Sequence, residues 1–204
     1  MARYFIGMSI VLAVALVAGC GGDDDTGVAA MSQGRWGHTA TLLEDGRVLI
    51  VGGQESPSRK LDTAEIFDPS TGLWSAASSL AEKHGSGLKT VLLEDGRVLV
   101  LGENDDASAE IYDPSTGQWS SAGVMSEARN WPSATLLEDG RVLVAGGSDA
   151  TKAGLEELTT AEIYDPSTGE WTETGSMEQV HSGQSAVVLD GKVLVVGKYI
   201  AETY

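Results

Sequence analysis

The nine residues Thr-Leu-Leu-Glu-Asp-Gly-Arg-Val-Leu at positions 41–49 decide the fold, because this phrase recurs along the chain. It returns as Val-Leu-Leu-Glu-Asp-Gly-Arg-Val-Leu at 91–99 and as Thr-Leu-Leu-Glu-Asp-Gly-Arg-Val-Leu at 135–143. A looser copy, Val-Val-Leu-Asp-Gly-Lys-Val-Leu, occupies 187–194. The turn glycines of successive copies are 50, 44 and 51 residues apart. A period of this length indicates an array of one repeated supersecondary unit.

Each phrase predicts a β-hairpin. Asp-Gly between apolar residues is a strong hairpin signal, because glycine accepts the positive φ of a tight turn. A second phrase, Ala-Glu-Ile-Phe-Asp-Pro-Ser-Thr-Gly-Leu-Trp at 64–74, recurs at 109–119 and 161–171 and predicts a second hairpin around Asp-Pro-Ser-Thr-Gly. A helical reading fails, because turn-forming residues interrupt the chain about every ten residues. Four short antiparallel strands per unit predict the blade of a β-propeller.

Two features repeat in phase with the hairpins. A double glycine ends the second strand of two units, as Gly52-Gly53 and Gly146-Gly147. An aromatic residue is followed by tryptophan seven positions later in three units: Phe67 and Trp74, Tyr112 and Trp119, Tyr164 and Trp171. With these features the chain resembles the kelch family and its bacterial galactose-oxidase-like relatives over roughly residues 31–204. The fixed place of these tryptophans after each turn predicts packing between blades. The second and fourth units depart from the pattern, since each has a single glycine, Gly102 or Gly197.

The predicted fold is therefore all-β, with kelch-type four-stranded antiparallel blades over residues 31–204. The units lie at about 31–79, 80–124, 125–176 and 177–204, and the last is incomplete because residues 201–204 align with the third strand. We favour about three and a half to four blades in an incomplete propeller or open arc. In the alternative, residues 26–32 supply the missing strand and close a four-bladed ring. An open arc would leave unpaired blade edges, which predicts self-association or a partner chain.

The N-terminus has the pattern of an export signal. Arg3 precedes an apolar run at 5–17, which is too short for the roughly 20 residues of a membrane-spanning helix. Val17-Ala18-Gly19-Cys20 resembles the lipobox of bacterial lipoproteins, which implies cleavage before Cys20 and lipid on its thiol. We expect a lipoprotein signal peptide at 1–19 and a lipidated, Gly- and Asp-rich tether at 20–30. A plain secretory signal with an incidental cysteine is the alternative.

The lipobox resemblance implies a location in the bacterial cell envelope. Lipid on Cys20 would anchor the chain to the membrane, and Gly21 in place of aspartate favours the outer membrane or the cell surface. The composition of the chain argues against a nucleic-acid partner and against a disulfide framework. With 13 basic and 30 acidic residues and a net charge of −17, a nucleic-acid partner is not expected. One cysteine excludes an intramolecular disulfide.

No catalytic constellation is visible in the sequence. Galactose oxidase needs a tyrosine–cysteine cross-link, a second tyrosine and two histidines at copper, whereas the one cysteine here lies in the lipobox. No HExxH, CxxC, EF-hand or Gly-x-Ser-x-Gly spacing occurs. The acidic loop 103–106 is interpreted as solvated rather than as a calcium site. The Glu-Asp pairs before each turn are interpreted as turn formers. We therefore expect no cofactor, no metal and no enzymatic activity.

Trp36 and Trp131 differ from the repeated tryptophans. They lie in loops that lead into the first strand of a unit, beside Arg35 and Arg129. The kelch resemblance places such loops at one mouth of the propeller channel, so these four residues are candidates for ligand binding. The predicted function is a non-catalytic module, anchored in the envelope, that binds a protein or a glycan. The alternatives are a fragment of a larger galactose-oxidase-like enzyme with its catalytic residues elsewhere, and a purely structural envelope protein.

Overall fold

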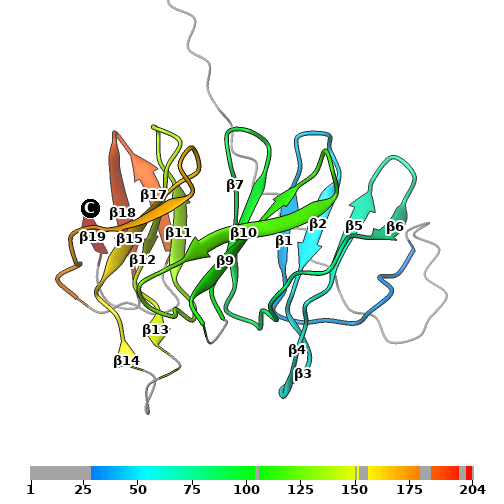
Figure 1. Ribbon diagram of the computed structural model, residues 1–204, viewed down its shortest axis with the longest axis horizontal. Coiled ribbons are helices and arrows are strands. Elements are labelled where there is room, and N and C mark those ends of the chain that lie inside the picture. Colours follow the sequence, from blue (N-terminus) through cyan, green and yellow to red (C-terminus); the bar gives the residue numbers. More distant parts are fainter. Residues whose placement is uncertain are drawn as a thin grey trace, which may run out of the picture.

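Three four-stranded antiparallel sheets and one three-stranded sheet follow one another in the computed structural model (Figure 1). The structure describes residues 29–103, 106–149, 151, 156–179, 185–197 and 201–203. The expected signal peptide, Cys20 and most of the tether lie outside these residues. We number the sheets as blades 1 to 4 in chain order. The prediction of an all-β fold with four-stranded antiparallel blades is confirmed for blades 1–3.

In blades 1–3 the four strands lie side by side in chain order, from the innermost outward. Blade 1 holds β1 (Thr39–Leu42), β2 (Val48–Val51), β5 (Ala64–Asp68) and β6 (Leu73–Ala76). Blade 2 holds β7 (Lys89–Leu92), β8 (Val98–Leu101), β9 (Ser108–Asp113) and β10 (Gln118–Val124). Blade 3 holds β11 (Ser133–Leu136), β12 (Val142–Ala145), β15 (Ala161–Asp165) and β16 (Glu170–Glu173). Blade 4 holds β17 (Ser185–Leu189), β18 (Lys192–Val196) and β19 (Ala201–Thr203).

Two small hairpins extend from the blades between their second and third strands. β3 (Gln54–Ser56) pairs with β4 (Arg59–Lys60) in blade 1, and β13 (Ser148–Asp149) pairs with β14 (Glu156–Glu157) in blade 3. Both hairpins project from the lower edge of the arc in Figure 1. They therefore lie at the end of the molecule opposite the Asp-Gly turns.

The Asp-Gly turns form as the sequence predicts. Gly46 has φ +86°, and its N–H donates to the carbonyl of Leu43 at 3.0 Å. The Asp45 carboxylate accepts hydrogen bonds from the backbone N–H and the Nε of Arg47, at 3.0 and 2.7 Å. These bonds hold the pKa of Asp45 below its usual value. The same arrangement recurs at the equivalent aspartates of blades 2 and 3, so these acids are turn formers.

The double glycines exist because a neighbouring loop passes against them. Gly53 has φ +87°, and a Cβ added to it would lie 2.7 Å from the carbonyl oxygen of Trp36. Gly147 has φ +91°, and its added Cβ would lie 2.6 Å from the carbonyl oxygen of Asn130. Only glycine combines a left-handed backbone with such a close approach. In blade 2 the second glycine is replaced by Glu103, which keeps the positive φ, at +58°.

The core lies between the blades. All four residues of β8 are fully buried, as expected for a continuously apolar strand with a blade on either side. The rings of Tyr112 and Trp119 lie 5.0 Å apart, and the Trp119 indole N–H donates to the carbonyl of Ser78 in the preceding blade at 2.7 Å. Trp171 repeats this bond to Ala122 of blade 2. The prediction of packing between blades is therefore confirmed for Trp119 and Trp171, whereas the Trp74 indole N–H donates to the carbonyl of Ala29.

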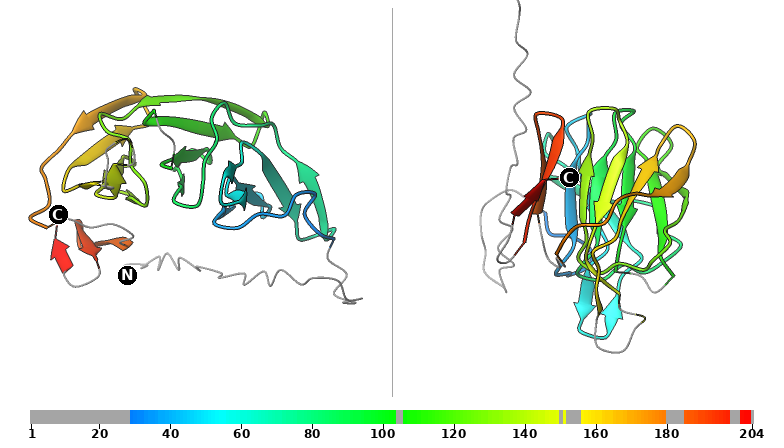
Figure 2. Two further views of the ribbon diagram at one scale, coloured as in Figure 1. Left: turned by 90° about the horizontal axis from the view of Figure 1, so that it is seen from below. Right: turned by 90° about the vertical axis from the view of Figure 1, so that its left-hand side faces the viewer.

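The four blades form an open arc rather than a closed ring. The inner strands are in contact in the order β1, β7, β11 and β17, and blades 1 and 4 lie at opposite ends of the arc (Figure 2). The four-bladed ring closed by residues 26–32 is not seen in the described residues. The backbone N–H of Ala29 donates to Gly72, and that of Ser32 donates to Glu65. Both contacts hold this segment on blade 1, far along the arc from blade 4.

Candidate functional site

The two tryptophans expected to meet a ligand lie on one face of the arc. We call it the lead-in face. It comprises the loops that lead into the inner strands of blades 1–3 (residues 35–38, 84–88 and 129–132) and the hairpins β3–β4 and β13–β14. Trp36 is 49% exposed and Trp131 is 37% exposed. Large apolar side chains are thus presented to solvent from loops, where binding residues are commonly found.

The backbone of Trp36 is fixed although its side chain is exposed. Its N–H donates to the carbonyl of Gln54 at 3.0 Å, and the Gln54 N–H donates back at 2.9 Å. In blade 3 the same pair of bonds joins Asn130 and Ser148, both at 2.8 Å. Each lead-in loop of blades 1 and 3 is therefore attached to the hairpin beside it. The exposed indole of Trp36 stands on a rigid support.

Trp131 occupies a conformation that disfavours a large side chain. Its φ is +51°, in the left-handed region. Trp131 is the equivalent of Gly37 in blade 1, which has φ +67°, because Trp131 follows Asn130 as Gly37 follows Trp36. A non-glycine residue in this region costs about 1–3 kcal/mol. Pro132 restricts the residue before it further. Blade 3 therefore carries tryptophan where blade 1 has the residue best suited to that backbone.

The lead-in loop of blade 2 touches the lead-in loops of blades 1 and 3. A Cβ built on Gly37 would lie 2.4 Å from the Cβ of Ser86, and one built on Gly87 would lie 2.9 Å from the backbone nitrogen of Trp131. The loop of blade 2 has small residues at this point, Gly85-Ser86-Gly87, partly because the Glu103 side chain fills the space beside both glycines. Trp36 and Trp131 thus stand in the loops on either side of Gly85-Ser86-Gly87, a stretch without large side chains.

Arg35 does not join Trp36 at the surface. Its side chain is fully buried, and it donates to the carbonyls of Gly52 and Thr63, at 3.0 and 2.8 Å. It also forms an ion pair with Glu65 at 2.9 Å. Burial by itself would raise the pKa of Glu65, but hydrogen bonds from Ser32 and Arg35 bring it below its usual value. Burial and the charge of Arg35 lower the pKa of the neighbouring His38.

Arg129 repeats this arrangement in blade 3. Its side chain is also fully buried, and it donates to the carbonyls of Gly146 and Thr160, at 3.1 and 2.9 Å. Glu162 pairs with it at 3.0 Å. The expectation that Arg35 and Arg129 contact a ligand does not fit the structure, because both guanidinium groups are enclosed and bonded within their own blades. Of the four candidates, Trp36 and Trp131 are the ones exposed to solvent.

Blade 2 has histidine at the position of these arginines. The buried His84 contacts the carbonyl oxygen of Gly102 through Nδ1 at 2.8 Å, and its Nε2 lies 3.7 Å from the Glu110 carboxylate. Glu110 also accepts hydrogen bonds from the backbone N–H groups of Ala81 and Glu82. Burial would raise the pKa of Glu110, but the nearby His84 side chain and the bonds from these N–H groups lower it.

The sequence analysis did not identify the acidic partners of these buried basic side chains, although the sequence contains a signal for them. Glu65, Glu110 and Glu162 each interrupt an apolar strand at the same place in the Ala-Glu-Ile phrase. A charged residue on a buried strand needs a partner of opposite charge. A basic residue stands about 30 residues earlier in each unit, in the lead-in loop, and the pairing could have been proposed on that ground.

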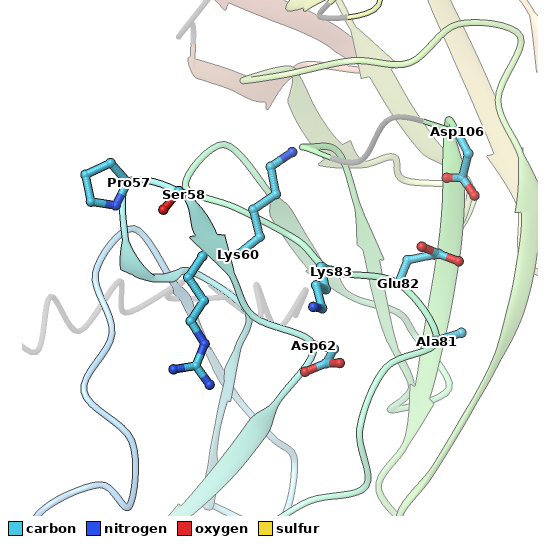
Figure 3. A pocket seen from close by; sticks show the side chains of 9 residues that line it. Pro57, Ser58, Lys60, Asp62, Ala81, Glu82, Lys83 and Asp106 are labelled. Carbon is cyan, nitrogen blue, oxygen red and sulfur yellow. The ribbon is translucent and has the colours of Figure 1, made fainter.

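A hollow of about 570 Å³ opens beside the hairpin β3–β4 (Figure 3). Cations and acids share its walls: Arg59, Lys60, Asp62, Glu82, Lys83 and Asp106. Arg59 is paired with Glu55, and the Lys60 ammonium donates to the carbonyl of Glu103 at 3.1 Å. The mixed charges of this hollow do not select a ligand of either sign.

The described residues contain no group of three or more His, Cys, Asp or Glu side chains placed to hold a metal ion. His181, Cys20 and part of the acidic loop 103–106 lie outside them. In the same described part of the chain, no helix is long and apolar enough to cross a membrane.

Comparison with known protein families matches the Kelch motif to residues 45–81 and 139–178. The chain contains kelch repeats. The first match spans the outer three strands of blade 1, and the second covers the same part of blade 3. These are the two blades with a double glycine and a buried arginine–glutamate pair. A comparison with curated proteins gives no match.

Proposed function

We propose that the chain is a non-catalytic interaction module that binds a protein or a glycan through the lead-in face, with Trp36 and Trp131 as the main contacts. The observation that carries this proposal is the pair of exposed indoles on two loops that both touch the lead-in loop of blade 2. Kelch repeat domains generally serve as interaction modules, which agrees with this reading.

The chemistry of the two tryptophans suits recognition. An indole offers a large apolar face to a sugar ring or an apolar side chain, and its N–H adds a hydrogen-bond donor. Tryptophan is also the residue type most enriched among the side chains that dominate binding energy. Because the backbones of Trp36 and of the Trp131 loop are fixed by the hairpins, little conformational entropy is lost on binding.

The backbone of Trp131 adds an independent argument. Its left-handed φ lowers the stability of the folded chain. Backbone strain of this kind is concentrated at functional sites. Glycine in the equivalent position of blade 1 shows that the fold itself does not need tryptophan there.

Glycan and peptide arrays probed with the purified full chain test this proposal. Trp36→Ala and Trp131→Ala should each weaken binding to any ligand found by about 30-fold, the loss typical of a tryptophan anchor. Leu73→Ala is the matched control, because Leu73 is 60% exposed but lies on the outer strand β6. Unchanged binding by the Trp36→Ala/Trp131→Ala double variant, with a wild-type circular dichroism spectrum, would refute the proposal.

We further propose that the module is held at the bacterial cell envelope, in the outer membrane or at the cell surface, by lipid on Cys20. The support is the lipobox-like Val17-Ala18-Gly19-Cys20 after a short apolar run. Labelling of growing cells with radioactive palmitate should mark the wild-type chain but not Cys20→Ala. Palmitate on the Cys20→Ala chain would contradict the anchor.

A further inference from the structure

The interface between successive blades occurs three times among the residues that the structure describes. Each blade gives one face, here called the leading face, to the blade that follows it, and the opposite, trailing face to the blade before it. Between blades 2 and 3 the leading face presents apolar residues that are at most 8% exposed: Val91, Leu93, Leu99 and Leu101. The trailing face of blade 3 meets them with Leu136, Val142, Val144 and Tyr164. Blades 1 and 2 and blades 3 and 4 meet in the same way.

Blade 4 presents a leading face that is exposed. By strand register its residues are the equivalents of the buried set of blade 2: Val187, Leu189, Leu194 and Val196. Three of them are large exposed side chains, with 54% of Val187, 60% of Leu189 and 45% of Val196 open to solvent. The trailing face of the same blade is covered, since Val193 is 4% and Val195 is 0% exposed. Blade 4 is thus built to receive a neighbour on its second side.

Blade 1 presents the complementary trailing face. Leu42 is 56% exposed there, whereas its equivalents Leu92 and Leu136 pack against the preceding blade. Phe67 and Val48 are only half-buried, although tyrosine and valine at the equivalent positions of blades 2 and 3 are at most 2% exposed. Figure 2 shows that blades 1 and 4, which carry these two faces, lie at the two ends of the open arc.

We propose that two copies of this chain associate head to tail, so that the leading face of blade 4 in each copy packs on the trailing face of blade 1 in the other. A second copy is the expected partner because of the repeat itself. At the three interfaces between successive blades, residues equivalent to those on the leading face of blade 4 pack against residues equivalent to those on the trailing face of blade 1. Two such contacts close a two-fold ring of eight blades, four from each copy, within the roughly four to eight blades that propellers use. A contact between unlike faces that closes on itself also avoids open-ended filaments.

A hydrogen bond within the chain gives the geometry of this contact. Thr41 on the leading face of blade 1 donates through Oγ1 to Oγ1 of Thr90 on the trailing face of blade 2, at 2.8 Å. By register Val187 of blade 4 is the equivalent of Thr41, and Ala40 of blade 1 is the equivalent of Thr90. In the proposed pair, Val187 of one copy therefore lies against Ala40 of the other. Cysteines at these two positions would be close enough to form a disulfide.

Disulfide trapping in the full chain with Cys20→Ala tests the proposal, because this background has no other cysteine. A mixture of Ala40→Cys and Val187→Cys chains should give a cross-linked dimer on mild oxidation, and neither variant alone should. Leu73→Cys mixed with Val187→Cys is the negative control, since Leu73 lies on an outer strand. Thr41→Cys/Thr90→Cys within one chain is the positive control for the geometry.

Analytical ultracentrifugation of the same Cys20→Ala chain gives the second measurement. We expect a dimer at about 100 μM, a concentration well above the Kd of most specific interfaces. Val187→Asp should give a monomer, whereas Leu73→Asp should remain a dimer. The dimer fraction should rise with salt concentration, because each copy carries a net charge of −17 and salt screens the repulsion between the two copies.

A monomer of the parent chain at this concentration would overturn the proposal. So would a disulfide that forms within a single Ala40→Cys/Val187→Cys chain, because it would mean that one arc closes on itself. Dimers cross-linked by Val187→Cys alone would show like faces packing together and would also overturn it. Loss of array binding in Trp36→Ala with the dimer intact would separate this assembly from the ligand-binding role.

Discussion

Removing Arg129 from its buried pair with Glu162 should cost blade 3 several kilocalories per mole of stability. The side chain of Arg129 is 0% and that of Glu162 is 2% exposed, and their charged atoms are 3.0 Å apart. Arg129 also donates to two backbone carbonyls, those of Gly146 and Thr160. Arg129→Met keeps most of the volume but removes every one of these donors. Glu162 is then left as a buried carboxylate without a cation.

The size of the effect follows from that arrangement. Breaking a buried ion pair by removing one partner costs about 3–5 kcal/mol. Each carbonyl left unsatisfied adds to this cost, whereas the apolar surface of methionine offsets part of it. We therefore expect Arg129→Met to lower the free energy of unfolding by about 4 kcal/mol. For a chain of 150–250 residues this corresponds to a fall in Tm of about 8–16 °C.

Urea and thermal unfolding, followed by tryptophan fluorescence, measure the loss. Arg141→Met is the matched control in the same blade, because the side chains of the Arg141–Asp139 pair are 45% and 51% exposed and the pair should contribute little to stability. Arg129→Met/Glu162→Leu should recover part of the loss, because it removes the unpaired charge as well. The reasoning is refuted if Arg129→Met and Arg141→Met cost the same, or if the double variant is less stable than Arg129→Met.

Three further outcomes are expected. The pKa of Glu65 is lowered in the folded state, so the folded chain binds fewer protons than the unfolded chain, and stability should drop as pH falls below about 4.3. Glu65→Gln should flatten this part of a curve of Tm against pH, and an unchanged slope would contradict the prediction. Trp131→Gly should be about 1 kcal/mol more stable than Trp131→Ala in urea unfolding, because both lose the indole but only alanine is strained at φ +51°; equal midpoints would count against the strain. Gly53→Ala should cost about 3 kcal/mol of stability, because its Cβ would lie 2.7 Å from the carbonyl oxygen of Trp36. Gly34→Ala, whose Cβ would have nothing within 4 Å, should cost under about 0.5 kcal/mol in the same assay, and similar losses for the two variants would rule out the clash.

The blades could be predicted from sequence because their determinants are local. The turn at Gly46 needs only its own left-handed φ and the side chain of Asp45 bonding to Arg47 two residues on. The buried strand that follows is apparent from its continuous apolar residues, and the packing role of Trp119 from its fixed place after the second turn. The repeat then supplied the same evidence several times, so that one unit confirmed the interpretation of the next.

The candidate site was predicted only in part, because its outcome depends on distant residues. Arg35 and Trp36 are neighbours in the lead-in loop, and no local feature says which of the two reaches solvent. The choice is made by Glu65, a residue 30 positions away, whose buried carboxylate holds the guanidinium inside the blade. The left-handed backbone of Trp131 was equally invisible in the sequence, because it arises where the loop passes against Gly147 and the lead-in loop of blade 2.

By itself, the sequence determined the repeating unit, its hairpins and the two loops that carry Trp36 and Trp131. Those features depend on backbone preferences and hydrogen bonds within a few residues, which a short stretch of chain encodes completely. The tertiary structure decided that Arg35 and Arg129 are buried while the tryptophans are exposed, and that the ends of the arc present matching apolar faces. Burial and charge pairing join residues from different strands and blades, and their energies exist only once the blades are assembled.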